Sequence, residues 1–388
     1  MSAHRSTAAP GGRIRRLAAA TLTVPLAATG PLTAATAPAH AAAGDGVGIA
    51  VSMGDSYISG EAGRWAGNSD TTGGDRDGTD RAWTGSGYDP AQVYGATYRS
   101  GCDRSDSAEV LSAFGPAGAV DLACSGATTA NVLRAGSGGQ AFKGEAPQAD
   151  QLATLAAQRR VGLVVLSIGG NDLGFASAIA DCVEDYEFWG GDCNSTEQAA
   201  IDGRMDAAMA GVGKSIDEIR AVLSADGYAA GDYRIVLQSY PSPLPRSAEN
   251  RYPASGWSRT TQGGCPLGDA DLDWARDQLV PQISQRLAQV AADRGAQFLD
   301  LQDLLQGHEA CSTAAAQGTG ASTAEWARYL TTGATQGTMQ ESFHPDYYGQ
   351  LALGRCLDLV AARPAGQNYA CRNTPGQDAS GIQLNQLP

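Results

Sequence analysis

Short apolar runs alternate with longer helical stretches along most of this chain. Strands are expected over residues 47–53, 119–123, 161–168, 233–238 and 296–301. Helices are expected over residues 107–114, 147–159, 197–225, 271–294 and 346–362. Buried strands that alternate with helices form a parallel sheet covered on both faces. The pattern therefore predicts an α/β fold, in which reactive groups lie at the carboxyl ends of the strands.

Residues 1–41 are expected to be a secretory signal peptide and no part of the fold. Four arginines without an acidic residue come first, an apolar, alanine-rich run follows, and small residues mark a cleavage site at about residues 41–43. A membrane anchor is the alternative, but prolines and a glycine interrupt the apolar run. We expect a secreted, extracellular protein with one folded domain over 44–371 and a loose, polar tail over 372–388.

The charge of the chain argues against two classes of partner. The sequence has a formal net charge of −14 at pH 7, and loss of the arginine-containing leader makes the remainder more negative. An acidic surface repels nucleic acids and anionic membranes. No stretch after the leader is long and apolar enough to span a bilayer. We therefore expect neither a nucleic-acid partner nor a stable membrane anchor.

All eight cysteines follow the leader, and an even number in a secreted chain predicts four disulfides. The count alone allows 105 connectivities. Our hypothesis is sequential pairing, which gives Cys102–Cys124, Cys182–Cys193, Cys265–Cys311 and Cys356–Cys371. A zinc site is the alternative, but no pair is spaced C-x-x-C and only two histidines follow the leader. We expect no metal and no cofactor.

Two motifs directly follow the first two predicted strands. The sequence GDSY at 54–57 places Ser56 where a substrate can reach it. An Asp-Ser turn or a helix cap is an equally good interpretation of this tetrapeptide. The sequence SGAT at 125–128 contains Gly126, whose N–H can approach a developing oxyanion closely. Taken alone this motif is weak, since most glycines serve turns.

Two further motifs supply an amide and an imidazole. The sequence GGND at 169–172 follows the third predicted strand, and the side chain of Asn171 can donate to developing negative charge. The sequence ESFHP at 341–345 contains His344, a general base whose imidazole Glu341 could orient. A turn and a structural histidine are the respective alternatives. We expect His308, next to a cysteine, to be structural.

A serine, a donor glycine, a donor asparagine and a histidine together make an acyl-transfer site. In this order the four motifs resemble the SGNH (GDSL-type) hydrolase family, particularly its secreted, disulfide-bonded bacterial esterases and lipases. The resemblance implies a three-layer, flavodoxin-like fold with a five-stranded parallel sheet over the domain at 44–371. It makes Ser56 the nucleophile and His344 the general base. It assigns the oxyanion hole to the N–H groups of Ser56 and Gly126 and to the side chain of Asn171.

Two positions depart from the family pattern. Tyr57 stands where the family name has leucine, and we expect no effect on the chemistry. The family usually has aspartate three residues before the histidine, whereas this chain has Glu341. The resemblance also offers an alternative, a main-chain carbonyl near this place, which some relatives use instead. We assign the third catalytic role to position 341 and leave open which of its oxygens acts.

The expected activity is hydrolysis of carboxylic esters by a monomeric lipase or esterase acting on a small-molecule or lipid ester. A carbohydrate O-acetyl esterase or a phospholipase is the enzymatic alternative. A secreted binding protein that has lost catalysis is the alternative from another class. We expect residues 60–87 to form a surface loop. Trp65 and Trp83 lie within this loop, and Tyr88 directly follows it. They either line a substrate pocket or serve packing.

Overall fold

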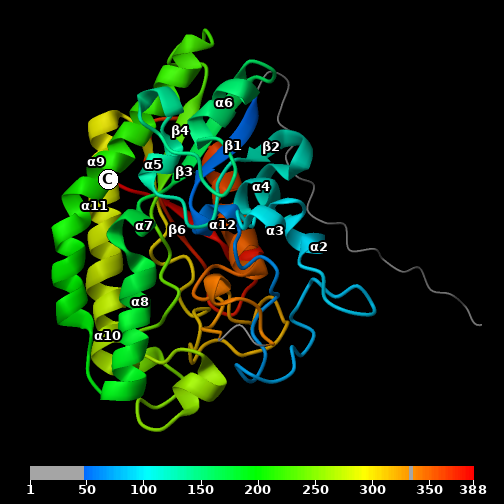
Figure 1. The fold of residues 1–388 in the computed structure, drawn as a ribbon, viewed down its shortest axis with the longest axis vertical. Helices are drawn as coiled ribbons and strands as arrows, with labels where there is room; N and C mark the ends of the chain where they lie inside the picture. Colours follow the sequence, from blue (N-terminus) through cyan, green and yellow to red (C-terminus); the bar gives the residue numbers. More distant parts are fainter. Residues whose placement is uncertain (1–47, 332–334) are drawn as a thin grey trace, which may run out of the picture. The chain divides into compact units, whose positions relative to one another are not determined.

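The computed structural model describes residues 48–331 and 335–388, so the signal peptide predicted over 1–41 lies outside the described residues. One sheet of seven strands forms the centre of the domain (Figure 1). Its strands are β1 (Ile49–Gly54), β2 (Ala119–Asp121), β3 (Val161–Ser167), β4 (Arg234–Gln238), β5 (Gln297–Asp300), β6 (Tyr369–Arg372) and β7 (Gln383–Gln386).

The order of the strands in the sheet is β2-β1-β3-β4-β5-β6-β7, and every neighbouring pair is parallel except β6 and β7. The first five strands have the 2-1-3-4-5 order of flavodoxin-like sheets. In such sheets the order reverses between β1 and β3, and ligands bind beyond the carboxyl ends of the strands there. The expectation of five strands was wrong, because β6 and β7 extend the sheet beyond β5.

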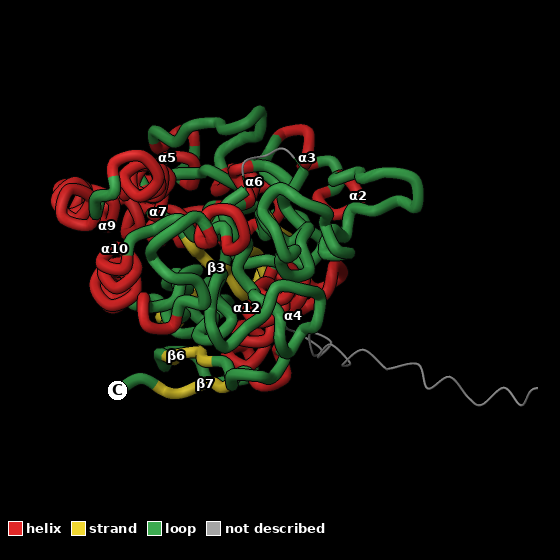
Figure 2. The backbone as a smooth tube through the Cα atoms, turned by 90° about the horizontal axis from the view of Figure 1, so that it is seen from below, coloured by secondary structure: helices red, strands yellow, loops and turns green. Residues whose placement is uncertain are grey.

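Helices lie on both faces of the sheet. Their bounds are α1 (Ser56–Ser59), α2 (Ala91–Tyr94), α3 (Thr97–Ser100), α4 (Glu109–Gly118), α5 (Thr129–Val132), α6 (Gln148–Ala156), α7 (Gly170–Leu173), α8 (Phe175–Glu184), α9 (Asn194–Ala225), α10 (Asp269–Trp274), α11 (Val280–Arg294) and α12 (Tyr347–Ala361). Helices α9 and α11 pack side by side over one face, and α4 and α12 pack together over the other (Figure 1). Long loops connect these elements (Figure 2).

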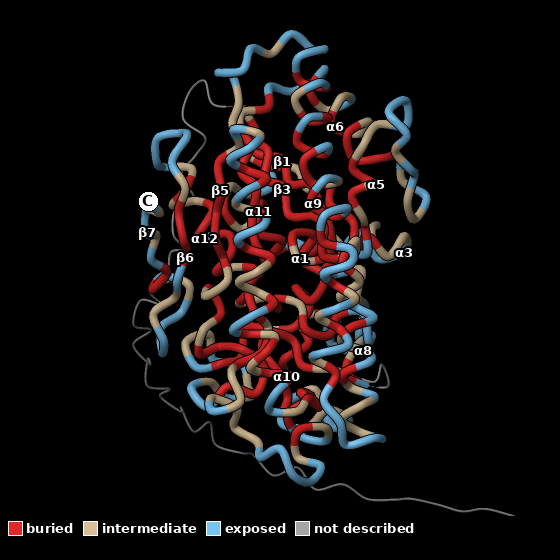
Figure 3. Tube along the Cα trace, turned by 90° about the vertical axis from the view of Figure 1, so that its left-hand side faces the viewer, coloured by how far each residue is buried: buried red, intermediate tan, exposed pale blue. Residues whose placement is uncertain are grey.

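The alternation of side chains along β3 explains why both faces need cover. Val164 and Leu166 belong to the apolar cluster beneath α9, whereas Leu163 and Val165 belong to the cluster beneath α4 and α12. All four are buried, since successive side chains of a strand point to opposite faces. Figure 3 shows the result, with buried strands at the centre and exposed outer faces on the helices. No helix among the described residues is long and apolar enough to cross a membrane.

The C-terminal segment ends in strand β7 of the sheet, so the prediction of a loose tail over 372–388 was wrong. Strand β7 pairs antiparallel with β6, and Ile382 is buried while Leu384 packs against the cluster beneath α12. The physical reason is the edge of β6, whose backbone N–H and C=O groups need partners. Ile382 and Leu384 alternate with polar residues, so one face of this segment can pack against the core.

The structure pairs the eight cysteines in sequential order, as Cys102–Cys124, Cys182–Cys193, Cys265–Cys311 and Cys356–Cys371. Each closes a loop of modest length, the longest spanning 46 residues. Such a crosslink stabilises a fold by about 2–4 kcal/mol, chiefly by restricting the unfolded chain. The first of them holds the loop after β2 immediately before Ser125 and Gly126.

The stretch at 60–87 is only partly the surface loop that its composition predicted. Trp65 is fully buried, with the guanidinium carbon of Arg328 3.7 Å from the centre of its ring. Arg64 donates two hydrogen bonds to the buried carboxylate of Asp80. The segment is buried because contacts with a distant part of the chain cover it, and these contacts leave no pattern in the local sequence.

Candidate active site

Ser56 is placed by a rigid turn at the end of β1. Gly54 has a φ of 143°, and a Cβ atom there would lie 1.9 Å from the carbonyl oxygen of Ser167, so only glycine fits. The side chain of Gln148 binds both the N–H and the C=O of Gly54, at 2.7 Å each. Asp55 then caps helix α1 by accepting from the N–H of Tyr57. Ser56 is thereby the first residue of a helix at the carboxyl end of the strand.

The structure brings His344 to Ser56 across 288 residues of sequence. The Nε2 atom of the imidazole lies 2.6 Å from the Ser56 Oγ, and its Nδ1 atom lies 2.9 Å from the carbonyl oxygen of Ser342. A carbonyl oxygen can only accept, so Nδ1 carries the proton of the neutral ring. It follows that Nε2 accepts the hydrogen bond that the Ser56 hydroxyl donates, which is the arrangement a general base requires.

The loop that carries His344 is fixed by main-chain pairing. The N–H of Phe343 donates to the carbonyl of Arg328 at 2.8 Å, and the N–H of Arg328 donates to the carbonyl of His344 at 2.9 Å. Helix α12 begins directly after the loop, where the side chain of Asp346 caps it. The imidazole therefore approaches Ser56 from a segment with little freedom to move.

The side chain of Glu341, one of the two groups at this position that could orient His344, is bonded to other partners. One of its carboxylate oxygens accepts from the hydroxyl of Tyr94 at 2.8 Å, and the other accepts from the N–H of Thr338 at 2.8 Å. The second bond belongs to a capping box of the short 3₁₀ turn at 339–341. The carbonyl of Ser342, one residue further on, takes the orienting position on the imidazole instead.

Burial sets the protonation of the imidazole. Desolvation lowers the pKa of His344 to about 4, and hydrogen bonds with the main chain of Ser342 and Glu341 oppose this shift. At neutral pH the ring is therefore uncharged and its Nε2 is free to take a proton. A neutral imidazole next to a serine hydroxyl is the ground state that acyl transfer needs.

The motifs that follow β1, β2 and β3 each carry an N–H group that can donate to an oxyanion. The N–H of Ser56 opens helix α1, and Gly126 takes a φ of 82°, which glycine adopts without strain. Within the described residues neither N–H donates to another protein group. The Asn171 amide donates one hydrogen bond to the carbonyl of Ala127 at 2.8 Å, which orients it and leaves its second hydrogen free.

Hydrogen bonds join the loops that carry these groups. The N–H of Cys124 donates to the carbonyl of Gly54 at 3.1 Å, which links the loops after β1 and β2. The carboxylate of Asp172 accepts from the N–H and the hydroxyl of Thr129, at 3.0 and 2.6 Å. Asp172 follows Asn171, so this contact links the loops after β2 and β3. The motifs that follow the first three strands therefore meet at the switch point of the sheet.

Sequence reasoning missed a tyrosine that connects two of the motifs. The hydroxyl of Tyr240 donates to the carboxylate of Asp55 and accepts from the N–H of Gly170 at 3.0 Å. Burial raises the pKa of Asp55 to about 7, against the effect of the Tyr240 hydrogen bond. Tyr240 follows β4 by two residues, and its position at the carboxyl end of a strand was the available signal.

The other candidates of the sequence do not join this site. His308 is fully buried, lies flat against Trp326 with 3.8 Å between the ring centres, and has its Nδ1 atom 2.7 Å from the carbonyl of Ala324. Trp83 and Tyr88 are exposed and pack against each other, with 4.9 Å between ring centres. These contacts support a structural role for His308 and local packing for the aromatic pair.

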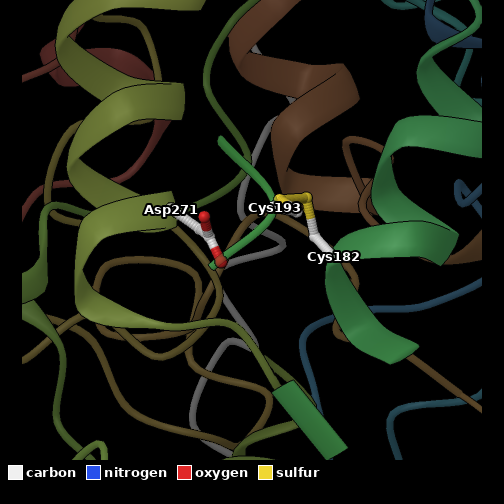
Figure 4. A group of neighbouring side chains, drawn as sticks. All are labelled: Cys182, Cys193 and Asp271. Atoms are coloured by element: carbon white, nitrogen blue, oxygen red, sulfur yellow. A yellow bond between two sulfur atoms is a disulfide. The ribbon is translucent and has the colours of Figure 1, made fainter. Parts of the chain in front are cut away.

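One group of side chains has the residue types of a metal site. Cys182, Cys193 and Asp271 lie close together (Figure 4). The two sulfur atoms are joined in a disulfide, which leaves no thiolate to bind an ion. Asp271 accepts from the N–H of Asn194 at 3.0 Å and so supports the start of α9. This cluster therefore has a structural explanation.

A hollow among the described residues lies apart from the four motifs. It has a volume of about 450 Å³ and is lined by Tyr186, Asp192, Trp257 and Asp269, among others. None of its lining residues belongs to the motifs that contain Ser56, Gly126, Asn171 and His344.

Known proteins resemble this chain in sequence and structure. "Lipase 1" of Streptomyces coelicolor is 30% identical over 193 residues, which are 49% of this chain and 55% of that protein. "Esterase" of Streptomyces scabiei is 28% identical over 184 residues, or 43% of this chain and 50% of that protein. The matches thus span about half the length of these curated relatives. The crystal structure of an extracellular lipase from Streptomyces rimosus aligns with a TM-score of 0.45 at 23% identity, covering 81% of this chain and 99% of that chain.

The family comparison covers most of the chain. The sequence model described as the GDSL-like lipase/acylhydrolase family matches residues 53–351, a range that contains all four motifs. This match is consistent with the α/β architecture and with the contact between the serine and the histidine. The chain therefore belongs to the GDSL-like lipase/acylhydrolase family.

Proposed function

We propose that the protein is a secreted serine hydrolase that cleaves carboxylic esters through an acyl-enzyme on Ser56. The observation that carries the proposal is the 2.6 Å contact between the Ser56 Oγ and the Nε2 of a neutral His344. A serine hydroxyl is a weak nucleophile unless a positioned base removes its proton as it attacks. This contact supplies such a base at hydrogen-bonding distance.

In the first half of the reaction, the Ser56 Oγ attacks the carbonyl carbon of the ester while its proton moves to Nε2 of His344. The imidazolium that forms keeps its Nδ1–H on the carbonyl of Ser342, 2.9 Å away. Negative charge develops on the ester oxygen and is held by the N–H groups of Ser56 and Gly126 and the amide of Asn171. His344 then gives its proton to the departing alcohol.

In the second half, a water molecule takes the place of the alcohol. His344 removes a proton from this water as it attacks the acyl carbon, and then returns the proton to Ser56 as the carboxylic acid leaves. The third role of the mechanism belongs to the Ser342 carbonyl and not to a carboxylate. A main-chain dipole can fix the tautomer and orientation of the ring, although it provides less charge than an aspartate.

Secretion and a lipid or small-molecule ester substrate are parts of the same proposal. All eight cysteines are paired, as is common in proteins that function in oxidising compartments. The curated relatives carry the names lipase and esterase. The acyl length that the protein prefers is identified by the panel of esters described next.

The test combines two variants with a panel of esters. Ser56→Ala and His344→Ala should each lower kcat by at least about 10³-fold while their thermal unfolding stays that of a folded protein. Near wild-type turnover in either variant would refute the mechanism. The panel contains acyl esters of increasing length, a phospholipid and an acetylated sugar, and the preferred member identifies lipase, phospholipase or carbohydrate esterase. A wild-type protein inactive on every ester supports the binding-protein alternative.

A further inference from the structure

Tyr57 connects the helix of the nucleophile to the loop of the base. Its hydroxyl donates to the carbonyl of Phe343 at 2.8 Å, across 286 residues of sequence. Its ring centre lies 4.9 Å from the centre of the His344 imidazole. The rings of Tyr57 and Tyr240 form a T-shaped pair with 5.2 Å between centres, so a second aromatic contact supports the Tyr57 ring.

The carbonyl that Tyr57 binds belongs to Phe343, which lies directly between Ser342 and His344 in the loop of the base. Phe343 has a φ of 58°, a left-handed conformation that costs a non-glycine residue free energy and persists only where surrounding contacts hold it. Its neighbours are Ser342, whose carbonyl orients Nδ1, and His344 itself. Rotation of the Phe343 peptide would therefore move both the imidazole and the group that orients it.

The backbone of Tyr57 is itself firmly held. Its N–H donates to the carboxylate of Asp55 at 3.2 Å, and its carbonyl accepts from the side chain of Gln350 at 2.9 Å. The side chain of Tyr57 thus extends from a firmly held backbone to the strained peptide of Phe343. A leucine, which gives the family motif its name, has no donor and could not make this bond.

We infer that Tyr57 is a positioning residue, which holds the Phe343 peptide in its left-handed conformation and thereby sets the distance between His344 and Ser56. This inference rests on the proposed function, because it assigns a role within that mechanism. It also departs from the expectation that the tyrosine at this position is without effect on the chemistry. In this chain the residue after the nucleophile compensates for the missing carboxylate by fixing the loop of the base.

The decisive variant is Tyr57→Phe, which keeps the ring and removes only the donor. Displacement of a catalytic group by about 1 Å can cost about 10²-fold in rate, so we expect kcat to fall at least tenfold while KM changes by less than about twofold. Tyr57→Leu should be no more active than Tyr57→Phe. The matched control is Tyr228→Phe, since the Tyr228 hydroxyl also donates to a main-chain carbonyl, that of Arg159, at the opposite end of β3. This control should keep its kcat.

Two readouts separate positioning from a general loss of structure. Rates are divided by the concentration of active sites, titrated with a fluorophosphonate, and the acid limb of kcat/KM is recorded. In Tyr57→Phe the looser imidazole should be better hydrated, which moves the acid limb upward toward the value of a free histidine. A kcat deficit that disappears after active-site titration, or an acid limb identical to that of the wild type, would overturn the inference.

The failure of this inference can be told apart from failure of the proposed function. If the wild type is not labelled by the fluorophosphonate, or if His344→Ala keeps its turnover, the mechanism itself is wrong. If both of those tests succeed and Tyr57→Phe has the kcat and pH profile of the wild type, only the role of Tyr57 is wrong.

Discussion

The acid limb of the pH–rate profile should lie far below that of an ordinary histidine enzyme. Burial lowers the pKa of His344 from 6.5 to about 4, so the base stays neutral in mildly acidic solution. At pH 5 a base with a pKa near 4 is about 90% neutral, whereas one with the ordinary value is only about 3% neutral. The structure therefore predicts that kcat/KM at pH 5 retains most of its plateau value.

The assay follows hydrolysis of a short-chain ester from about pH 3.5 to pH 9 by quantifying the released alcohol, so that no titrating product interferes. Asp55 is the neighbouring group that also titrates within this range, since burial raises its pKa to about 7. The control variant Asp55→Asn removes that titration and keeps a side-chain oxygen for the cap of α1. If the acid limb belongs to His344, it should survive in this variant.

An acid limb with its midpoint near 6.5 in the wild type would refute the reasoning, because it would mean that the imidazole is hydrated in the free enzyme. Loss of the acid limb in Asp55→Asn would also refute the reasoning, because the titration would then belong to the Asp55 carboxyl and not to His344. A plateau that extends below about pH 5 in both proteins is the predicted result.

Three further predictions concern the oxyanion donor, the third catalytic role and stability. Asn171→Ala should lower kcat by about 10²–10³-fold with little change in KM, and equal losses in binding would contradict its role. Glu341→Gln should keep kcat within about threefold in steady-state assays, whereas a catalytic carboxylate in that position would make the loss about 10⁴-fold. Burial raises the pKa of Glu109 to about 8 and that of Asp121 to about 7. The folded protein thus holds protons that the unfolded chain releases, so the melting temperature should fall as pH rises from about 5 to 7.5, opposed only in part by His344. Glu109→Gln should flatten this dependence in calorimetry, and a melting temperature that rises with pH would contradict it.

The sheet could be predicted where the sequence alone determines burial. Strand β3 lies within one residue of its predicted bounds, because its valines and leucines are buried on both faces and need no distant partner to be recognised. Strand β7 could not be found in this way. Its residues become a strand through pairing with the edge of β6, and this pairing depends on where the preceding chain has already placed that edge.

The parts of the site that consist of side chains could be predicted from the sequence, whereas the main-chain groups could not. Ser56 and His344 were identified from residue type and order, and the structure places their reactive atoms 2.6 Å apart. The Ser342 carbonyl could not be identified, because every residue has a carbonyl and only its orientation distinguishes it. The role inferred for Tyr57 was hidden for a related reason, since its partner is the main chain of Phe343, at the other end of the domain sequence.

The most direct test of the account is the rate at which a fluorophosphonate reacts with one serine. In the wild type, mass spectrometry of peptides should place the phosphonyl group on Ser56, and His344→Ala should slow the reaction by several orders of magnitude without unfolding the protein. Labelling at another residue, or equal rates in the two proteins, would show that this imidazole does not activate this hydroxyl.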